Sequence, residues 1–334
     1  MKIAKLDKSG LYQELDSVNK LRCEVNMTRA MQFNSVAKIN SLFWITSLGG
    51  NEIGVTNRIL EDLEPSCASR GLTFEKLAPT TASELLIALD EIAARATSGM
   101  LPIIHFDTHG SVDGGIHIVQ SGENISWPDI ADKLRIINEI TGNNLCVVSC
   151  ACFSFHVVSE IDINRSAPFY ILIAPEQEIP AGDIESNIVK FYQDMLDEED
   201  IITAHKRRFD GTLRVFHCEK MLAIVLAKYV NNAGLGKQRA RRKEDLVSMA
   251  INLGLPRNRK NLRALRKQAN KLISVREDLI KRFLPTFLCG KRPGFSIAQI
   301  KDLVIEARAN GLEPQGPYAR QIGINPASLS EFPK

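Results

Sequence analysis

The sequence of 334 residues predicts an α/β fold, a doubly wound and mostly parallel sheet with helices on both faces, followed by a mainly helical, basic domain. The first observation is that short apolar runs alternate with amphipathic segments between residues 41 and 196, as parallel βαβ units do. The second is an uneven charge distribution. Residues 1–200 hold 15 Lys and Arg against 29 Asp and Glu, whereas residues 201–334 hold 27 against 10.

The charge distribution also predicts the domain boundaries. We expect an N-terminal segment over residues 1–40 that packs on the core, an α/β domain over residues 41–205, and a basic helical domain over residues 206–334. Domains of opposite charge attract each other. An uneven spread of charge over one surface remains the alternative.

Composition narrows the class of protein. Hydrophobic residues make up 44% of the chain, which is enough for a sizeable core. No apolar run reaches the roughly 18 residues of a transmembrane helix, and the first residues lack the long apolar stretch of a signal peptide. We therefore expect a cytoplasmic protein without membrane insertion. The seven cysteines are scattered along the chain, and in that compartment we expect free thiols.

Apolar spacing and turn signals define the first elements of the α/β domain. They alternate as strand 41–48, helix 54–70, strand 72–77, helix 81–96 and strand 101–106. Thr81, with Glu84 three residues later, has the spacing of a capping box and marks the start of the second helix.

Further along, a glycine-rich turn precedes an apolar run and a second turn, which together predict a hairpin over residues 116–124. Ser126 is placed to cap a helix that ends near Ile140. The remaining elements are strand 144–149, strand 169–174 and helix 183–196. The acidic run 197–200 then predicts a flexible linker, and it is a candidate self-cleavage site.

The basic part of the chain predicts helices over residues 217–231, 237–252, 257–283 and 296–309. Its cations gather in residues 206–208, 237–243 and 257–271. Within 261–267 the leucines share one face and the cations another. Three interpretations stay open: a solvated face, a surface for an acidic protein or the chain's own acidic domain, and a nucleic-acid surface. Few aromatics accompany these cations, which argues against a stacking platform for single strands.

Two strand ends carry the candidate chemistry. The strand at 101–106 runs into His109-Gly110, and the strand at 144–149 runs into Cys150-Ala151-Cys152. Neighbouring parallel strands bring their carboxyl ends to one edge of the sheet, where open α/β sheets place their active sites. A thiol becomes a good nucleophile beside a base. The pattern therefore predicts a cysteine hydrolase.

The same stretches resemble the caspase-like cysteine peptidases, the clan of caspases, separase and clostripain, and within it most closely the bacterial CHAT-type proteases. The matching stretches are residues 105–111, 125–131, 147–154 and 170–192. Together they cover roughly residues 40–200. The resemblance implies a caspase-like sheet and peptide-bond hydrolysis without a metal or an organic cofactor.

Carried over by position, the family's catalytic histidine is His109 and its nucleophile is Cys152. The resemblance gives the oxyanion donors as the backbone N–H groups of Gly110 and Cys152. His109 would activate the thiol, protonate the leaving amine, or do both.

Each of these residues has a rival in the sequence. Cys150 is the alternative nucleophile, although the run of apolar residues, a small residue and alanine before Cys152 favours the latter. His105 lies within its strand, and we expect a packed or hydrogen-bonded core histidine. His117 and His156 are expected to be peripheral. No second Cys/His pair at zinc spacing accompanies Cys150 and Cys152, so we predict no metal site.

The substrate pocket is predicted from four residues: Asp107, Cys150, Glu176 and Asp183. The resemblance places the residue two before the nucleophile in the primary pocket. Here that residue is Cys150, which is uncharged, so we expect a small or apolar substrate residue before the cut. Asp107 would orient His109, line the pocket or be a solvated turn carboxylate. Glu176 and Asp183 would either receive a Lys or Arg side chain or be solvated loop charges.

The resemblance implies a regulated bacterial thiol protease of antiviral (antiphage) defence that cleaves one or a few specific proteins. A gasdermin-like pore former, or another defence component, is the substrate class it implies, and a partner would trigger the cut. The basic helical domain would recognise the partner, the substrate or the trigger. The alternative is a non-catalytic adaptor or a nucleic-acid-binding effector that uses this basic domain.

Overall fold

The computed structural model describes residues 33–198 and 200–309, and these form two compact units. The sheet unit comprises Asn34–Lys220 and Phe283–Pro293. The helical unit comprises, among the described residues, Phe33, Met221–Arg282 and 294–309. The boundary expected between residues 205 and 206 falls inside a helix of the sheet unit, α7 (Ile201–Arg208), and that unit continues to Lys220. Most of the expected N-terminal segment, residues 1–32, lies outside the described residues.

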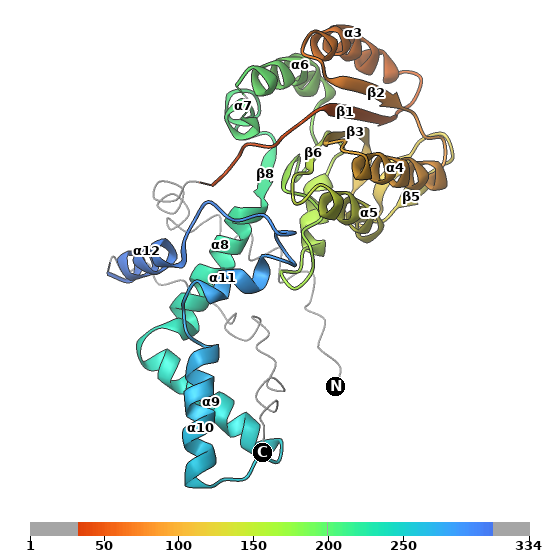
Figure 1. Ribbon diagram of the computed structural model, residues 1–334. Helices are drawn as coiled ribbons and strands as arrows, with labels where there is room; N and C mark the ends of the chain where they lie inside the picture. The colour runs from red at the N-terminus through yellow and green to blue at the C-terminus, as the bar shows by residue number, and fades with distance from the viewer. Residues whose placement is uncertain (1–32, 199, 310–334) are drawn as a thin grey trace. The chain divides into compact units, whose positions relative to one another are not determined.

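The sheet unit contains a mixed α/β fold, as the sequence predicts (Figure 1). Among the described residues its main sheet has the strand order β2-β1-β3-β6-β7-β8. The strands are β1 (Ser41–Ser47), β2 (Thr73–Leu77), β3 (Pro102–Ser111), β6 (Cys146–Ser149), β7 (Ile171–Ala174) and β8 (Arg214–His217). Each neighbouring pair is parallel except β7 and β8, which are antiparallel. The mostly parallel sheet is therefore confirmed.

Helices cover both faces of this sheet (Figure 1). On one face α3 (Ile53–Ser69) packs against α6 (Ala181–Glu198), and on the other α4 (Ala82–Thr97) packs against α5 (Trp127–Ile140). All residues of β1, β6 and β7 are buried, as expected for parallel strands covered on both faces. Each large apolar side chain buried here contributes about 1.5–3 kcal/mol to folding.

Two predicted helix starts are confirmed. The Thr81 hydroxyl accepts a hydrogen bond from the Glu84 N–H at 3.1 Å, and the Ser126 hydroxyl accepts one from the Asp129 N–H at 3.3 Å. The capping box at Thr81 is modified, because the Glu84 carboxylate accepts from the Thr80 N–H instead of the capping residue. Each cap satisfies an N–H group that has no partner within its own helix.

The predicted hairpin forms between β4 (Gly115–Ile118) and β5 (Glu123–Ile125). The antiparallel pairing also includes β3, which the sequence predicted to end at residue 106. β3 continues beyond the main sheet to Ser111, and its last residues pair with β4. His109 therefore lies in the extended part of β3, opposite His117. This extension fixes the backbone of the candidate histidine within a ladder.

The acidic run is not a flexible linker in its described residues. Asp197 and Glu198 belong to α6, and Asp200 caps α7, accepting hydrogen bonds from the N–H groups of Ile202 and Thr203. Glu199 lies outside the described residues. The prediction of a flexible linker is wrong for these residues, because Asp197 and Glu198 form the end of α6 and Asp200 caps the start of α7.

The described elements of the helical unit are helices. After α8 (Cys218–Tyr229), which begins in the sheet unit, come the π-helical segment η2 (Val230–Gly234), α9 (Gly236–Asn252), α10 (Arg259–Leu272), α11 (Asp278–Phe283) and α12 (Ile297–Ala309). The single helix predicted over residues 257–283 is interrupted after Leu272. There the Ser274 hydroxyl donates to the Lys271 carbonyl at 2.8 Å, a side-chain bond that competes with helix continuation.

Within the described ranges, the structure contains no helix of the length and apolar character that crossing a lipid bilayer requires.

Candidate active site

The carboxyl ends of three adjacent strands define the candidate site. β3 lies between β1 and β6, and all three run parallel, with Ser47 opposite Thr108 and Phe106 opposite Ser149. His109 follows Thr108 on β3, and Cys152 lies in the turn after β6. Both residues therefore lie at the same edge of the sheet, where parallel sheets expose functional groups.

Backbone contact joins the two strand ends at Gly110. A Cβ atom added to this glycine would lie 2.5 Å from the Cys152 carbonyl oxygen and 3.2 Å from the Ala151 Cβ. Real Cβ atoms do not approach a carbonyl oxygen this closely, so only glycine allows the segments to meet. The residue after the candidate base thus lies against the residue that carries the candidate nucleophile.

Cys152 lies on a sharp, strained turn. The next residue, Phe153, has a φ of +61°, in the left-handed region, which costs a non-glycine residue about 1–2 kcal/mol. The chain then enters the 3₁₀ helix η1 (Ser154–Glu160). Cys152 is half-buried, and neither its thiol nor its N–H has a hydrogen-bond partner among the described residues. Both groups are left available at this edge.

Glu52 holds the imidazole of His109. The Glu52 Oε2 and the His109 Nε2 lie 2.9 Å apart, and the two side chains are 48% and 46% exposed. The same oxygen accepts the Gly49 N–H at 3.2 Å, while the Glu52 N–H donates to the Gly49 carbonyl at 3.0 Å. A tight turn after β1 therefore fixes the carboxylate. The carboxylate contacts the Nε2 atom of the imidazole and not the Nδ1 atom.

The environment of Glu52 keeps its carboxylate ionised. Partial burial alone would raise its pKa, but the hydrogen bonds from His109 and the Gly49 N–H outweigh burial, so the pKa lies below its ordinary value of 4.5. An ionised carboxylate stabilises the protonated imidazole beside it. Because both groups are exposed, the pair contributes about 0.2–1 kcal/mol.

His105 is a core histidine, as predicted. It is fully buried, and its ring stacks on Trp44 with centroids 3.6 Å apart. Its Nδ1 lies 2.8 Å from the Tyr192 hydroxyl and its Nε2 lies 3.6 Å from the Cys150 Sγ. Burial lowers the pKa of His105 to about 3 and raises the pKa of Cys150 well above its ordinary value. This second thiol–imidazole pair is therefore neutral at physiological pH.

That contact bears on both interpretations of Cys150. A thiol with a raised pKa is a poor nucleophile, so the pair with His105 weakens Cys150 as the rival of Cys152. Cys150 was also predicted to line the substrate pocket. In the structure its sulfur contacts His105 of the core.

Asp107 is half-buried, and no hydrogen bond among the described residues joins its carboxylate to His109. Its Oδ2 accepts hydrogen bonds from the Trp44 Nε1 at 3.2 Å, the Thr56 hydroxyl at 2.5 Å and the Thr46 hydroxyl at 3.5 Å. Burial raises its pKa, although these bonds act in the opposite direction. The interpretation as a solvated turn carboxylate is wrong. The described carboxylate that contacts His109 is Glu52.

The other predicted pocket carboxylates lie in separate surroundings. Glu176 forms an ion pair with Arg214 of β8, and the Arg214 guanidinium lies 5.0 Å from the centroid of Phe155. Asp183 is exposed in the first turn of α6, where its charge complements the helix dipole. No hydrogen bond or ion pair among the described residues links either carboxylate to His109 or Cys152.

The two histidines that were expected to be peripheral, His117 and His156, have neighbours of their own. His117 lies opposite His109 in the β3–β4 ladder, and its Nδ1 is 2.8 Å from the Asn124 Oδ1. The His156 ring makes an edge contact with Phe153 at 6.4 Å between centroids, and burial lowers its pKa. His117 is thus the ladder neighbour of His109, and His156 contacts Phe153, the residue after Cys152.

In the part of the chain that the structure describes, no group of three or more His, Cys, Asp and Glu side chains is placed to hold a metal ion.

Glu52, which contacts His109, is a residue of this site that the sequence-based prediction did not include. A signal was present, because Gly49-Gly50-Asn51-Glu52 follows β1, the strand beside β3. The rule that pointed to His109 and Cys152 applies to every strand end at this edge.

Comparison with known proteins adds no assignment: no protein-family model matches the chain, and no curated protein matches it.

Proposed function

We propose that the chain is a cysteine endopeptidase related to the caspase-like, CHAT-type proteases, in which Cys152 is the nucleophile and His109 the general base. The observation that carries this proposal is the backbone contact between Gly110 and Cys152. It supports a site in which an imidazole and a thiol from distant segments share one sheet edge.

In this proposal His109 accepts the proton of the Cys152 thiol, and the thiolate sulfur attacks the scissile carbonyl carbon. The electron pair of the C=O bond moves to the oxygen, where N–H groups of Gly110 and Cys152 would stabilise it. The Cys152 N–H, without a partner among the described residues, supports that role. Removing one oxyanion donor typically costs about 3–4 kcal/mol of transition-state stabilisation.

As the C–N bond breaks, the proton on His109 passes to the leaving amine, and a thioester to Cys152 remains. Water, activated by the same imidazole, hydrolyses the thioester and restores the thiol. Glu52 has the geometry to hold His109 through Nε2 and to stabilise the imidazolium that exists between these steps.

Selective cleavage of one protein target, such as a gasdermin-like pore former or another defence component, belongs to the same proposal. So does activation by a partner in bacterial antiphage defence. The His109 Nε2 contacts the Glu52 carboxylate, and in this proposal activation completes the dyad with Cys152. For the residue before the cut we propose a small or apolar side chain.

The test is labelling of the full-length protein, with and without the lysate of its host, by a thiol-directed peptidyl electrophile. Mass spectrometry gives the rate at each cysteine. We expect Cys152 to react at least tenfold faster than Cys289, whose pKa burial raises to about 11, and His109→Ala to abolish the difference. His117→Ala, which removes the cross-strand neighbour, is the matched control. Equal rates at Cys152 and Cys289 in an activated sample would leave a non-catalytic adaptor as the better interpretation.

A further inference from the structure

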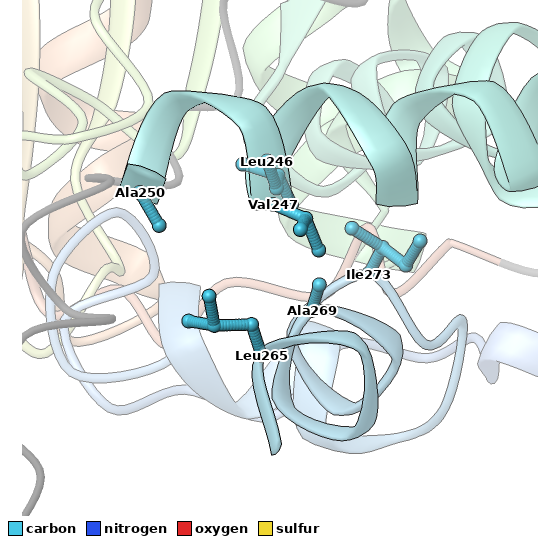
Figure 2. Close-up of a cluster of buried hydrophobic side chains, with 6 residues drawn as sticks. All are labelled: Leu246, Val247, Ala250, Leu265, Ala269 and Ile273. Atoms are coloured by element: carbon cyan, nitrogen blue, oxygen red, sulfur yellow. The ribbon is translucent and has the colours of Figure 1, made fainter. Parts of the chain in front are cut away.

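The hairpin formed by α9 and α10 in the helical unit carries a second candidate surface. The two helices pack through six buried side chains (Figure 2). These are Leu246, Val247 and Ala250 of α9 and Leu265, Ala269 and Ile273 at α10 and its C-terminal end. This core fixes the rotation of α10 about its axis, so the opposite face of α10 points to solvent.

Four cations follow one another along the exposed face of α10. Arg259, Arg263, Lys267 and Lys271 are all exposed and recur every four residues; we call them the α10 stripe. Successive members rise about 6 Å along the helix, so the stripe spans about 18 Å. Among the described residues none of these side chains has an ion pair or hydrogen bond. Arg266, in contrast, pairs with Glu244 at 2.9 Å.

This arrangement is unfavourable for the isolated chain. Like charges four residues apart on a helix repel each other by about 0.2–0.5 kcal/mol per pair. Arg259 and Lys260 stand in the first turn of α10, which has no acidic residue, and there they oppose the helix dipole. A polyanion along the stripe would relieve both effects.

The surroundings of the stripe favour phosphate over a protein partner. Residues 236–272 contain twelve Lys and Arg against two Asp and Glu, and no Phe, Tyr or Trp. The centre of a protein–protein interface is apolar and aromatic, with lysine depleted. Single strands are bound by stacking bases on aromatic rings. A duplex requires neither, and it presents about one negative charge per 1.7 Å of its axis, on the order of ten along the length of the stripe.

We propose that the α10 stripe binds the phosphate backbone of double-stranded nucleic acid without reading its sequence. The binding site is this helix face alone, and the proposal is independent of the chemistry at Cys152. Four phosphate contacts predict that log K falls with log salt at a slope of about −3.6. Affinity would therefore fall about 150-fold between 50 and 200 mM salt.

The experiment measures fluorescence anisotropy of labelled 20-base-pair duplexes with the full-length protein over a salt series. The stripe variant replaces Arg259, Arg263, Lys267 and Lys271 by Gln. The matched control replaces four exposed lysines of the sheet unit, Lys38, Lys76, Lys190 and Lys206, by Gln, which removes the same charge. We expect wild type and control to bind with the predicted slope, and the stripe variant to lose at least tenfold in affinity and most of the slope.

Further arms separate the sources of binding. Among single substitutions, Arg263→Gln should weaken duplex binding more than Arg266→Gln, because Arg266 is already paired with Glu244. Equal binding by the stripe and control variants overturns the proposal, as does absence of duplex binding at 50 mM salt. Tighter stripe-dependent binding of a poly-glutamate peptide overturns it in favour of an acidic protein, and tighter binding of a single strand overturns the choice of duplex. Thermal melts, in which the stripe variant should be no less stable than wild type, exclude unfolding as the cause.

Discussion

Gly110 allows two strand ends to touch at one backbone position. We expect Gly110→Ala to lower the free energy of unfolding by about 1–3 kcal/mol, the usual cost of overpacking, because its Cβ would press on the Cys152 carbonyl oxygen. Urea denaturation gives the change in stability, and labelling of Cys152 by the peptidyl electrophile should slow as the strand ends separate. Gly182→Ala is the control, since a Cβ there meets nothing within 4 Å. Equal stability of the two variants would mean that this contact is not tight.

Glu52 gives the site a dependence on pH. Because its pKa is lowered in the folded state, the contribution of its pair with His109 is present above the ordinary value of 4.5 and is lost as pH falls through the lowered pKa. In Glu52→Gln the imidazolium that forms during the reaction loses this support.

We expect the labelling rate of Cys152 in Glu52→Gln to fall about two- to fivefold at pH 7, the equivalent of an exposed ion pair. The difference from wild type should shrink as pH falls through the lowered pKa of Glu52, where the carboxylate is protonated in wild type as well. Glu178→Gln, which removes a carboxylate from the exposed loop after β7, should leave the labelling rate unchanged. A labelling rate in Glu52→Gln equal to that of wild type at pH 7, with Cys152 still reactive, would exclude the positioning role of Glu52 and keep the dyad.

For single residues, the sequence was informative where a residue's position in its strand determines its location in the sheet. The rule that strand ends share an edge of a parallel sheet predicted that His109 and Cys152 lie at one edge, and they do. His105 was predicted in the core because it lies inside its strand, and it is buried there. The contacts of Asp107 with Thr56 and of His109 with Glu52 join residues 51 and 57 positions apart. They depend on how a helix start and a turn meet the sheet, which local pattern does not specify.

Among the elements, the sequence-based prediction missed α7, of eight residues, and β8, of four. The acidic run before them resembles a solvated stretch, yet Asp200 caps α7. We expect Asp200→Ala to destabilise the protein by about 1 kcal/mol, because two N–H groups lose their acceptor. Hydrogen exchange should show faster exchange within α7. Asp197→Ala, at an exposed ion pair with Arg70, should change stability by about 0.5 kcal/mol or less.

At the scale of the whole molecule, the charge distribution indicated two modules but not where the chain divides. The segment Phe283–Pro293 belongs to the sheet unit although it follows the basic helices. There the Phe287 carbonyl accepts the Ala167 N–H at 3.2 Å, and the Lys291 ammonium lies 3.3 Å from the centroid of the Tyr170 ring. Phe287 and Leu288 are fully buried. Composition cannot reveal such a return, because the pairing is between residues more than a hundred positions apart.

That return makes the molecule interleaved: within the described residues the backbone passes from one unit to the other four times, after residues 33, 220, 282 and 293. Domain dissection by truncation would therefore mislead. A fragment that ends at Lys220 lacks Phe287 and Leu288, which are buried in the sheet unit. We expect this fragment to expose apolar surface and to bind a hydrophobic dye. Joining residues 283–293 to Lys220 through a short designed linker should bury this surface again, and that shortened chain would be the appropriate isolated sheet unit for enzymology.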